Sequence, residues 1–491
     1  MELKIKFLKW SAGVPVAMLR KETAAKIGVR AQDRITIKRK NHAIFTSILD
    51  TVESGLIKPD EIGVSFEISN PLNLKQGQKV EIHFSPVPKS LELIKKKLNN
   101  IALSDSEIKE IITDVVDNSL SEAEIALFIS AMYRFGMSFR ETVSLIKAML
   151  ESGEKISFKE DFVVDKHSIG GIAGNRTTPL VVSICAAGGL IIPKTSSRAI
   201  TSAAGTADVI ETIAKVVFSM NELKKIIKKT NGCMVWGGSL GMAPADDKII
   251  QVERGLKIDP ESQLLASIMS KKLAMGAKYI LIDIPYGDSA KVSKKKALHL
   301  KKEFERLGRY FKKKLKVVLT DGSQPIGNGI GPILELMDIV NILSQKDGPR
   351  DLENKSLFLS GQIFELCGKA KKGGGIEIAK EILYSGKAFK KFKQIISAQH
   401  GSLKKLKISP IHQVIRSTQK GKISSIDNKK INSLARIAGC PADKSAGLYL
   451  HVHKNYSVQK NVPLMTIYAE SKSRLKEAVK FYFISKPIII R

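Results

Sequence analysis

The sequence is poor in cysteine and aromatic residues and has no long apolar segment, and each shortage excludes a class of protein. Its four cysteines are scattered without a Cys-x-x-Cys or Cys/His pattern, so neither a disulfide framework nor a zinc site is indicated, and we expect buried thiols. No apolar run is long enough to cross a bilayer, and the first residues lack the apolar block of a signal peptide. We therefore expect a cytoplasmic protein without a membrane partner.

Acidic residues are also few: 48 of them face 80 lysines and arginines, which gives a net charge of +32. Such a balance is typical of nucleic-acid-binding proteins. However, the lysines occur in short, scattered groups such as 294–296 and 369–372, without a basic helix, and aromatic residues make up only 6% of the chain. We therefore favour solvated lysine-rich surfaces that attract an anionic substrate over binding of nucleic acid.

A chain of 491 residues, 43% of them hydrophobic, is long enough for about three domains. Residues 1–86 have the pattern of a small N-terminal β domain. Segments 27–39 and 72–84 both place an apolar residue and a short polar turn before alternating apolar positions, which predicts an internal duplication folded into one barrel. This arrangement resembles a double-psi barrel.

A helical domain is predicted for residues 87–152. It contains three Ser-x-x-Glu capping boxes, each followed by apolar residues at helical spacing. Residues 153–242 and 275–400 predict an α/β domain with a mostly parallel sheet, because strand-like runs alternate with helical patterns. Residues 401–491 predict a C-terminal α+β part. The fold class is thus multidomain α/β.

The stretch between Val164 and Thr206 carries the most chemical information. The apolar residues 162–164 predict a buried parallel strand and residues 180–187 a helix, so residues 166–178 form the turn between them. Glycines in such a turn let the backbone approach an anion, and the helix dipole favours negative charge there. The spacing fits neither the Walker nor the dinucleotide motif. The groups that suit an inorganic phosphate are Gly170, Gly171, Gly174, Lys166, Ser168, Thr177 and Thr178.

Several motifs in this stretch resemble those of the nucleoside phosphorylase family that includes thymidine phosphorylase. The family's Asp-Lys-His-Ser-x-Gly-Gly, its Ser/Thr pair, its Pro-x-x-Ser-x-Arg loop and its Gly-Thr pair stand here at 165–171, 177–178, 193–198 and 205–206. Further segments are most similar to the N-terminally extended branch of AMP phosphorylases. These segments are 231–238, 243–247, 252–272 and 321–332. The resemblance covers nearly the whole chain, and it implies that residues 243–274 complete the helical domain.

The resemblance implies phosphorolysis of AMP to adenine and ribose 1,5-bisphosphate, with a nucleoside monophosphate and phosphate as the partners. It implies no cofactor beyond phosphate as co-substrate, no metal, and a homodimer or larger homo-oligomer. The AMP-binding residues carried over by motif are Gly171, Ser197, Arg198, Ala199, Ile200, Thr201, Ser202, Thr206, Ser267 and Lys291. The phosphate-binding residues are Lys166, Ser168, Thr178, Ser196 and Thr206.

The same resemblance implies a catalytic role for Asp259. In the family an aspartate donates a proton to the leaving base, and this role requires the carboxyl to be protonated when the cleft is closed. Asp259 also precedes Pro260, where it would cap a helix, and both roles are compatible. Pyrimidine enzymes have a base-reading arginine further ahead of the aspartate than Arg254 is, so we do not give Arg254 that role.

Three other functions stay open. Thymidine or pyrimidine nucleoside phosphorylases release the free base and a (deoxy)ribose 1-phosphate. A phosphoribosyltransferase would need acidic ligands for magnesium, and the one adjacent acidic pair in a family motif is 246–247. The third alternative is an RNA-binding protein.

Three further local features carry no assigned function. The glycines of residues 327–331 suit either a second phosphate cradle or a simple turn. His451 and His453 alternate on a predicted strand, but no third ligand has visible spacing, so we expect no metal there. His167 is interpreted as a structural residue.

Overall fold

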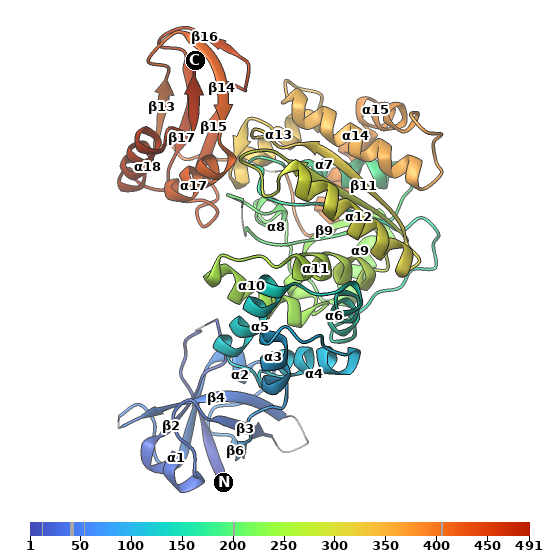
Figure 1. The fold of residues 1–491 in the computed structure, drawn as a ribbon. Coiled ribbons are helices and arrows are strands. Elements are labelled where there is room, and N and C mark those ends of the chain that lie inside the picture. Colours follow the sequence, from blue (N-terminus) through green and yellow to red (C-terminus); the bar gives the residue numbers. More distant parts are fainter. Residues whose placement is uncertain (12, 40–43, 54, 200–201, 404–405) are drawn as a thin grey trace. The chain divides into compact units, whose positions relative to one another are not determined.

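The computed structural model describes the chain except for residues 12, 40–43, 54, 200–201 and 404–405 (Figure 1). Two compact units are present, and neither is continuous in sequence. Unit 1 is made of residues 1–153 and 243–270, and unit 2 of residues 154–242 and 271–491. Among the described residues, no helix is both long and apolar enough to span a bilayer.

Unit 1 begins with a closed barrel of six strands. Its elements are β1 (Glu2–Phe7), β2 (Ala17–Arg20), α1 (Lys21–Ile27), β3 (Arg34–Lys38), β4 (Ile44–Val52), β5 (Glu61–Val64), α2 (Phe66–Ser69) and β6 (Lys79–Ser85). β1 lies parallel to β5 and antiparallel to β6, and β4 has the same relation to β2 and β3. The halves β1-β2-α1-β3 and β4-β5-α2-β6 therefore repeat one pairing pattern, as the two similar sequence segments predicted.

The rest of unit 1 is helical. Its helices are α3 (Ser90–Leu98), α4 (Asp105–Val116), α5 (Glu122–Phe135), α6 (Phe139–Glu151), α10 (Pro244–Leu256) and most of α11 (Glu261–Ala274). The three predicted capping boxes are confirmed at the starts of α4, α5 and α6. Lys248 of α10 donates hydrogen bonds to the carbonyls of Val115 and Val116, at 2.9 and 2.7 Å, and so satisfies the end of α4.

Unit 2 is built on parallel strands covered by helices (Figure 1). The strands are β7 (Val164–Ser168), β8 (Ile192–Ser196), β9 (Gly232–Trp236), β10 (Tyr279–Tyr286) and β11 (Lys314–Asp321). β7, β10 and β11 form one parallel sheet, β8 and β9 form another, and a parallel bridge between Val163 and Ile191 connects them. The helices of this region are α7 (Thr177–Ala187), α8 (Thr206–Ile210), α9 (Met220–Thr230), α12 (Lys294–Tyr310), α13 (Pro332–Leu343), α14 (Arg350–Leu366), α15 (Gly375–Tyr384) and α16 (Lys387–Ala398).

The predicted bounds of the strand and turn were wrong. β7 begins at Val164 and continues through Ser168, and α7 begins at Thr177 rather than after Thr178. The strand therefore includes Asp165 and Lys166, which an apolar run cannot reveal. These charges are tolerated inside because each has polar partners within the same region, as described below.

The C-terminal part is α+β, as predicted. Its elements are β13 (His412–Arg416), β14 (Gly421–Ile426), α17 (Asn428–Ala438), β15 (Gly447–Leu450), β16 (Ser457–Val458), β17 (Pro463–Tyr468), α18 (Lys472–Ser485) and β18 (Ile488–Ile490). β12 (Gly329–Ile330), which follows β11 in the chain, pairs with β15 at one edge of the antiparallel sheet. Ala173 and Ala203, from the loops after β7 and β8, are buried in the C-terminal core. This packing joins the C-terminal part to the loops of the parallel strands.

Candidate active site

The candidate site lies at the carboxyl ends of the parallel strands of unit 2, which share one edge because the strands are parallel. The loops at this edge are 169–176 after β7, 197–205 after β8 and 287–293 after β10. Most of the predicted phosphate and nucleotide ligands lie on the ends of these strands or on these loops. The edge therefore brings together most of the residues predicted to bind phosphate and nucleotide.

The turn after β7 requires glycine at two positions. Gly171 has φ +105°, and a side chain there would press within about 3 Å of the backbone of Lys291. Gly174 has φ +67°, and a side chain there would collide with the carbonyl of Ile326. The turn is thus shaped by conformation and by close packing of neighbouring loops.

Lys166 is the most deeply placed cation of the site. Its side chain is 1% exposed, and its ammonium donates to the Thr177 hydroxyl at the start of α7, at 2.7 Å. Burial lowers the pKa of Lys166 to about 7, although Asp283 acts in the opposite direction. A charge this costly to bury is typical of functional sites.

Ser168 lies beside a buried carboxylate on the neighbouring strand. Its hydroxyl donates to one oxygen of Asp283, at 2.6 Å, and the Thr320 hydroxyl of β11 donates to the other, at 2.6 Å. Lys355 of α14 forms an ion pair with Asp283 at 3.2 Å. Burial alone would raise the pKa of Asp283, but Lys355, Lys166 and the two hydroxyls outweigh it and hold the pKa below its ordinary value. This carboxylate orients Ser168.

Asp165, the first residue of the Asp-Lys-His-Ser-x-Gly-Gly motif, is held in a buried cluster of ion pairs. It is 1% exposed and pairs with Lys194 at 3.3 Å and Lys272 at 2.8 Å. Next to it, burial and the charge of Lys272 lower the pKa of His167 well below its ordinary value, so this ring is neutral at pH 7. A neutral, half-buried imidazole is compatible with the structural interpretation of His167.

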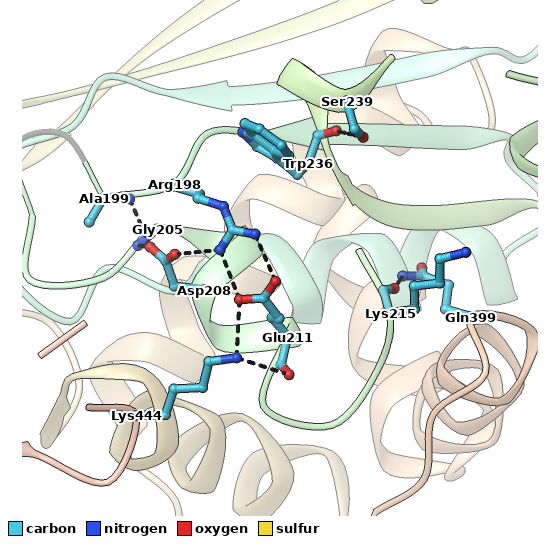
Figure 2. A network of polar contacts seen from close by, with 10 residues as sticks. All are labelled: Arg198, Ala199, Gly205, Asp208, Glu211, Lys215, Trp236, Ser239, Gln399 and Lys444. Carbon is cyan, nitrogen blue, oxygen red and sulfur yellow. Dashed lines mark hydrogen bonds and ion pairs between the residues drawn. The ribbon is translucent and has the colours of Figure 1, made fainter. Parts of the chain in front are cut away.

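The loop after β8 is braced by carboxylates of α8 and of the residue after it (Figure 2). Asp208 accepts hydrogen bonds from the backbone N–H groups of Ala199 and Gly205, both at 2.7 Å. Arg198 donates to both oxygens of Glu211, at 2.7 and 2.8 Å, and its guanidinium lies 5.0 Å from the centre of the Trp236 ring. The Arg198 side chain therefore holds the loop in place, and its charge is already balanced.

Lys444 extends the same network from the C-terminal part. It forms an ion pair with Glu211 at 3.0 Å (Figure 2). The hydrogen bonds from Arg198 and the charge of Lys444 lower the pKa of Glu211 to about 2, against the effect of burial. The Glu211 carboxylate is therefore ionised throughout the neutral pH range.

Arg176, at the end of the loop after β7, connects this loop with the loop after β8. No motif in the sequence indicated this role. Its guanidinium donates to Glu335 at 2.5 Å, to the Thr206 hydroxyl at 3.1 Å and to the Ala204 carbonyl at 2.5 Å. Thr206, predicted to contact both substrates, is thereby positioned at the start of α8.

Two asparagines of α17 were also missed. Asn428 accepts from the N–H of Ala173 at 3.0 Å and donates to the Ser289 hydroxyl at 3.0 Å. Asn432 accepts from the N–H of Ala203 at 2.9 Å and donates to the Gly171 carbonyl at 3.4 Å. Both are buried. One helix of the C-terminal part thus ties together loops that follow β7, β8 and β10.

The remaining predicted residues are distributed as follows. Thr178 is in the first turn of α7, Ser196 ends β8, and Lys291 lies in the loop after β10 against Gly171. Ser197 is exposed and Ser202 is half-buried, both in the loop after β8. Ile200 and Thr201 lie outside the described residues.

Asp259 and Ser267 belong to unit 1. Asp259 is exposed, two residues before the start of α11. Ser267 of α11 donates to Asp246 at 3.0 Å, and Gln263 donates to the same carboxylate at 2.9 Å. Asp246, considered above as half of an acidic magnesium pair, is fully buried and instead fixes the helix that carries Ser267.

The glycine-rich segment 327–331 does not cradle an anion. The N–H groups of Asn328 and Gly329 both donate to Asp338 at 2.8 Å, and that of Gly327 donates to Asp351. Carboxylates therefore occupy the amides that a phosphate would need, and the segment is a structural turn.

The two candidate histidine ligands are engaged elsewhere. His451 contacts the Thr466 hydroxyl and His453 the Asn328 side chain, both at 2.9 Å. Within the described part of the chain, no group of three His, Cys, Asp or Glu residues is arranged to hold a metal. All four cysteines, which are among the described residues, are buried and unpaired.

Three family models match the chain. The helical bundle domain of a glycosyl transferase family matches residues 91–153, and the a/b domain of the same family matches residues 160–389. The pyrimidine nucleoside phosphorylase C-terminal domain matches residues 422–483. These matches cover the helical part, the parallel sheet and the C-terminal part in chain order.

Several relatives are similar over nearly the whole chain. A putative thymidine phosphorylase of Legionella pneumophila (strain Corby) is 43% identical, with 94% of this chain and 90% of that protein aligned. AMP phosphorylase 1 of Archaeoglobus fulgidus is 40% identical, covering 98% and 96%. AMP phosphorylase of Thermococcus kodakarensis is 40% identical, covering 100% and 98%.

A solved structure shares the fold. Anthranilate phosphoribosyltransferase from Thermus thermophilus superposes with a TM-score of 0.52 over 63% of this chain and 99% of that chain. The two sequences are 18% identical, so this likeness concerns the fold alone.

Proposed function

Because the chain belongs to the thymidine and pyrimidine nucleoside phosphorylase family of glycosyltransferases, we propose that it is an AMP phosphorylase. The observation that carries this proposal is the similarity to AMP phosphorylases over 98–100% of the chain, N-terminal barrel included. The enzyme is a pentosyltransferase, and its substrates are a nucleotide and inorganic phosphate.

In the proposed reaction, an oxygen of phosphate forms a bond to C1′ of the ribose while the glycosidic bond breaks and its electron pair moves to adenine. Lys166 and the start of α7 would hold the attacking phosphate, since they supply a buried positive charge and the positive end of a helix dipole. The Ser168 hydroxyl, which donates to Asp283, would turn its proton from that carboxylate to the phosphate. Asp259 would give its proton to the departing adenine. The products are adenine and ribose 1,5-bisphosphate.

The second candidate is thymidine phosphorylase. It is favoured by the Legionella relatives, which are named putative thymidine phosphorylases and are 42–43% identical to this chain. The two functions differ in the base and in the 5′-phosphate of the substrate. Both are phosphorolytic, so both require inorganic phosphate.

Release of free base from AMP, CMP, UMP, adenosine and thymidine, measured with and without phosphate, tests the proposal. We expect phosphate-dependent release from AMP, far faster than from adenosine, because binding of the remote 5′-dianion orients the ribose for attack. Addition of EDTA should leave the rate unchanged, since the proposed reaction uses no metal. Rapid release from thymidine with AMP inert would replace the proposal by the second candidate.

A further inference from the structure

A cavity of about 270 Å³ lies between α17 and the loops after β7 and β10. Its lining residues are Gly171, Ser289, Lys291, Lys429, Asn432, Ser433 and Arg436. Three of these side chains are cationic and none is acidic. Such a lining favours an anion with several oxygen atoms.

One face of α17 supplies most of this lining. Lys429, Asn432, Ser433 and Arg436 stand at i, i+3, i+4 and i+7, so their side chains project from the same side of the helix. Lys430, the next residue, instead donates to the Ser485 carbonyl at 2.7 Å. The positive charge that α17 presents to the cavity therefore comes from Lys429 and Arg436, and not from every basic residue of the helix.

Hydrogen bonds fix the neutral groups of the cavity. The Ser289 hydroxyl accepts from the backbone and side-chain N–H groups of Asn428, at 3.2 and 3.0 Å, so its own proton is left to donate. Asp427 caps the helix by accepting from the N–H groups of Lys429 and Lys430. An anion would thus be bound by side chains, not by the helix terminus.

The cavity shares Gly171 with the phosphate turn. A ribose placed over Gly171 would direct C1′ toward the attacking phosphate and C5′ toward the cavity, because these carbons are at opposite ends of the sugar. We propose that Lys429 and Arg436 of α17, with Ser289, bind the 5′-phosphate of the nucleotide and so determine the preference for nucleotides over nucleosides. This inference rests on the proposed function.

The test compares Lys429→Ala with Lys430→Ala, a lysine of the same helix outside the cavity. Loss of an exposed charged contact should lower kcat/KM for AMP by about tenfold in Lys429→Ala, with adenosine changed less than twofold. Lys429→Arg should restore most of the AMP activity, and Lys430→Ala should resemble the wild type. Equal losses for AMP and adenosine, or no loss for either, would overturn the assignment.

Binding of ribose 5-phosphate, followed by calorimetry without turnover, separates this inference from the proposed function. We expect the wild type to bind it and Lys429→Ala to bind it at least about fivefold more weakly. That result supports the cavity assignment even if AMP proves not to be the substrate. Equal affinity of the two proteins would overturn the assignment even if the wild type is an AMP phosphorylase.

Discussion

Replacing Lys166 with methionine should remove most phosphorolysis and at the same time stabilise the fold. The side chain is 1% exposed, and burial lowers its pKa from 10.5 to about 7. One unit of pKa difference between the folded and unfolded states corresponds to about 1.4 kcal/mol, so burial of this amine lowers the free energy of unfolding at pH 7 by at most roughly 5 kcal/mol. Methionine fills a similar space without that cost.

The sign of the pH dependence follows from the same values. Because the folded pKa of Lys166 lies below the unfolded one, the unfolded chain binds more protons between about pH 7 and 10.5. Wild-type stability should therefore rise with pH across this interval, and Lys166→Met should lose part of the rise. Urea unfolding at pH 7 and pH 9 measures both effects.

Lys272 provides the matched comparison. It is also buried, but its ammonium lies 2.8 Å from Asp165, so Lys272→Met leaves a buried carboxylate with one partner fewer and should destabilise the protein by roughly 3 kcal/mol. For Lys166→Met we expect kcat/KM with phosphate to fall about a hundredfold. A variant that is destabilised like Lys272→Met and keeps full activity would refute the reasoning and make Lys166 a structural residue.

Three other outcomes are expected. Asp259→Asn should lower turnover about a hundredfold with unchanged unfolding midpoint, because asparagine matches the size of this exposed side chain but has no proton to transfer; normal turnover would remove Asp259 from the proposed reaction. Asn432→Ala should raise KM for phosphate and for AMP together, by about tenfold, since its amide joins both loops; a change in only one of the two would contradict this. Glu211→Gln should cost about 1 kcal/mol at pH 7, because Arg198 and Lys444 lose their ionised partner. Since the pKa of Glu211 is lowered from 4.5 to about 2, wild-type stability should fall as the pH drops through this interval, and acid titration of the variant should lack that step.

The sequence was sufficient for features that depend on neighbouring residues. Capping boxes at Ser104, Ser121 and Ser138 could be predicted because each involves a serine and a glutamate three residues apart. The duplicated barrel pattern also followed from local periodicity, and the alternation of strand-like and helical segments predicted the parallel sheet. These features need no knowledge of distant contacts.

Features that depend on distant contacts could not be predicted. The asparagines of α17 contact loops more than 200 residues earlier, and nothing in their local sequence indicates a bridging role. The bounds of β7 were missed for a related reason: Asp165 and Lys166 are compatible with a buried strand only because of partners supplied elsewhere. The role of segment 327–331 was decided by Asp338 and Asp351 on the two helices that follow it, and its glycine pattern alone does not indicate these contacts.

The hydrogen bonds from Lys248 to the end of α4 have a consequence for biosynthesis. A ribosome completes residues 1–153 long before it reaches α10, so the nascent barrel can close while the carbonyls of Val115 and Val116 still face water. Strand β7 emerges in the interval, before its partner β10 exists. Both units therefore lack part of their structure until residues 243–320 have been synthesised. We expect both units to complete their folding only after this stretch has been translated.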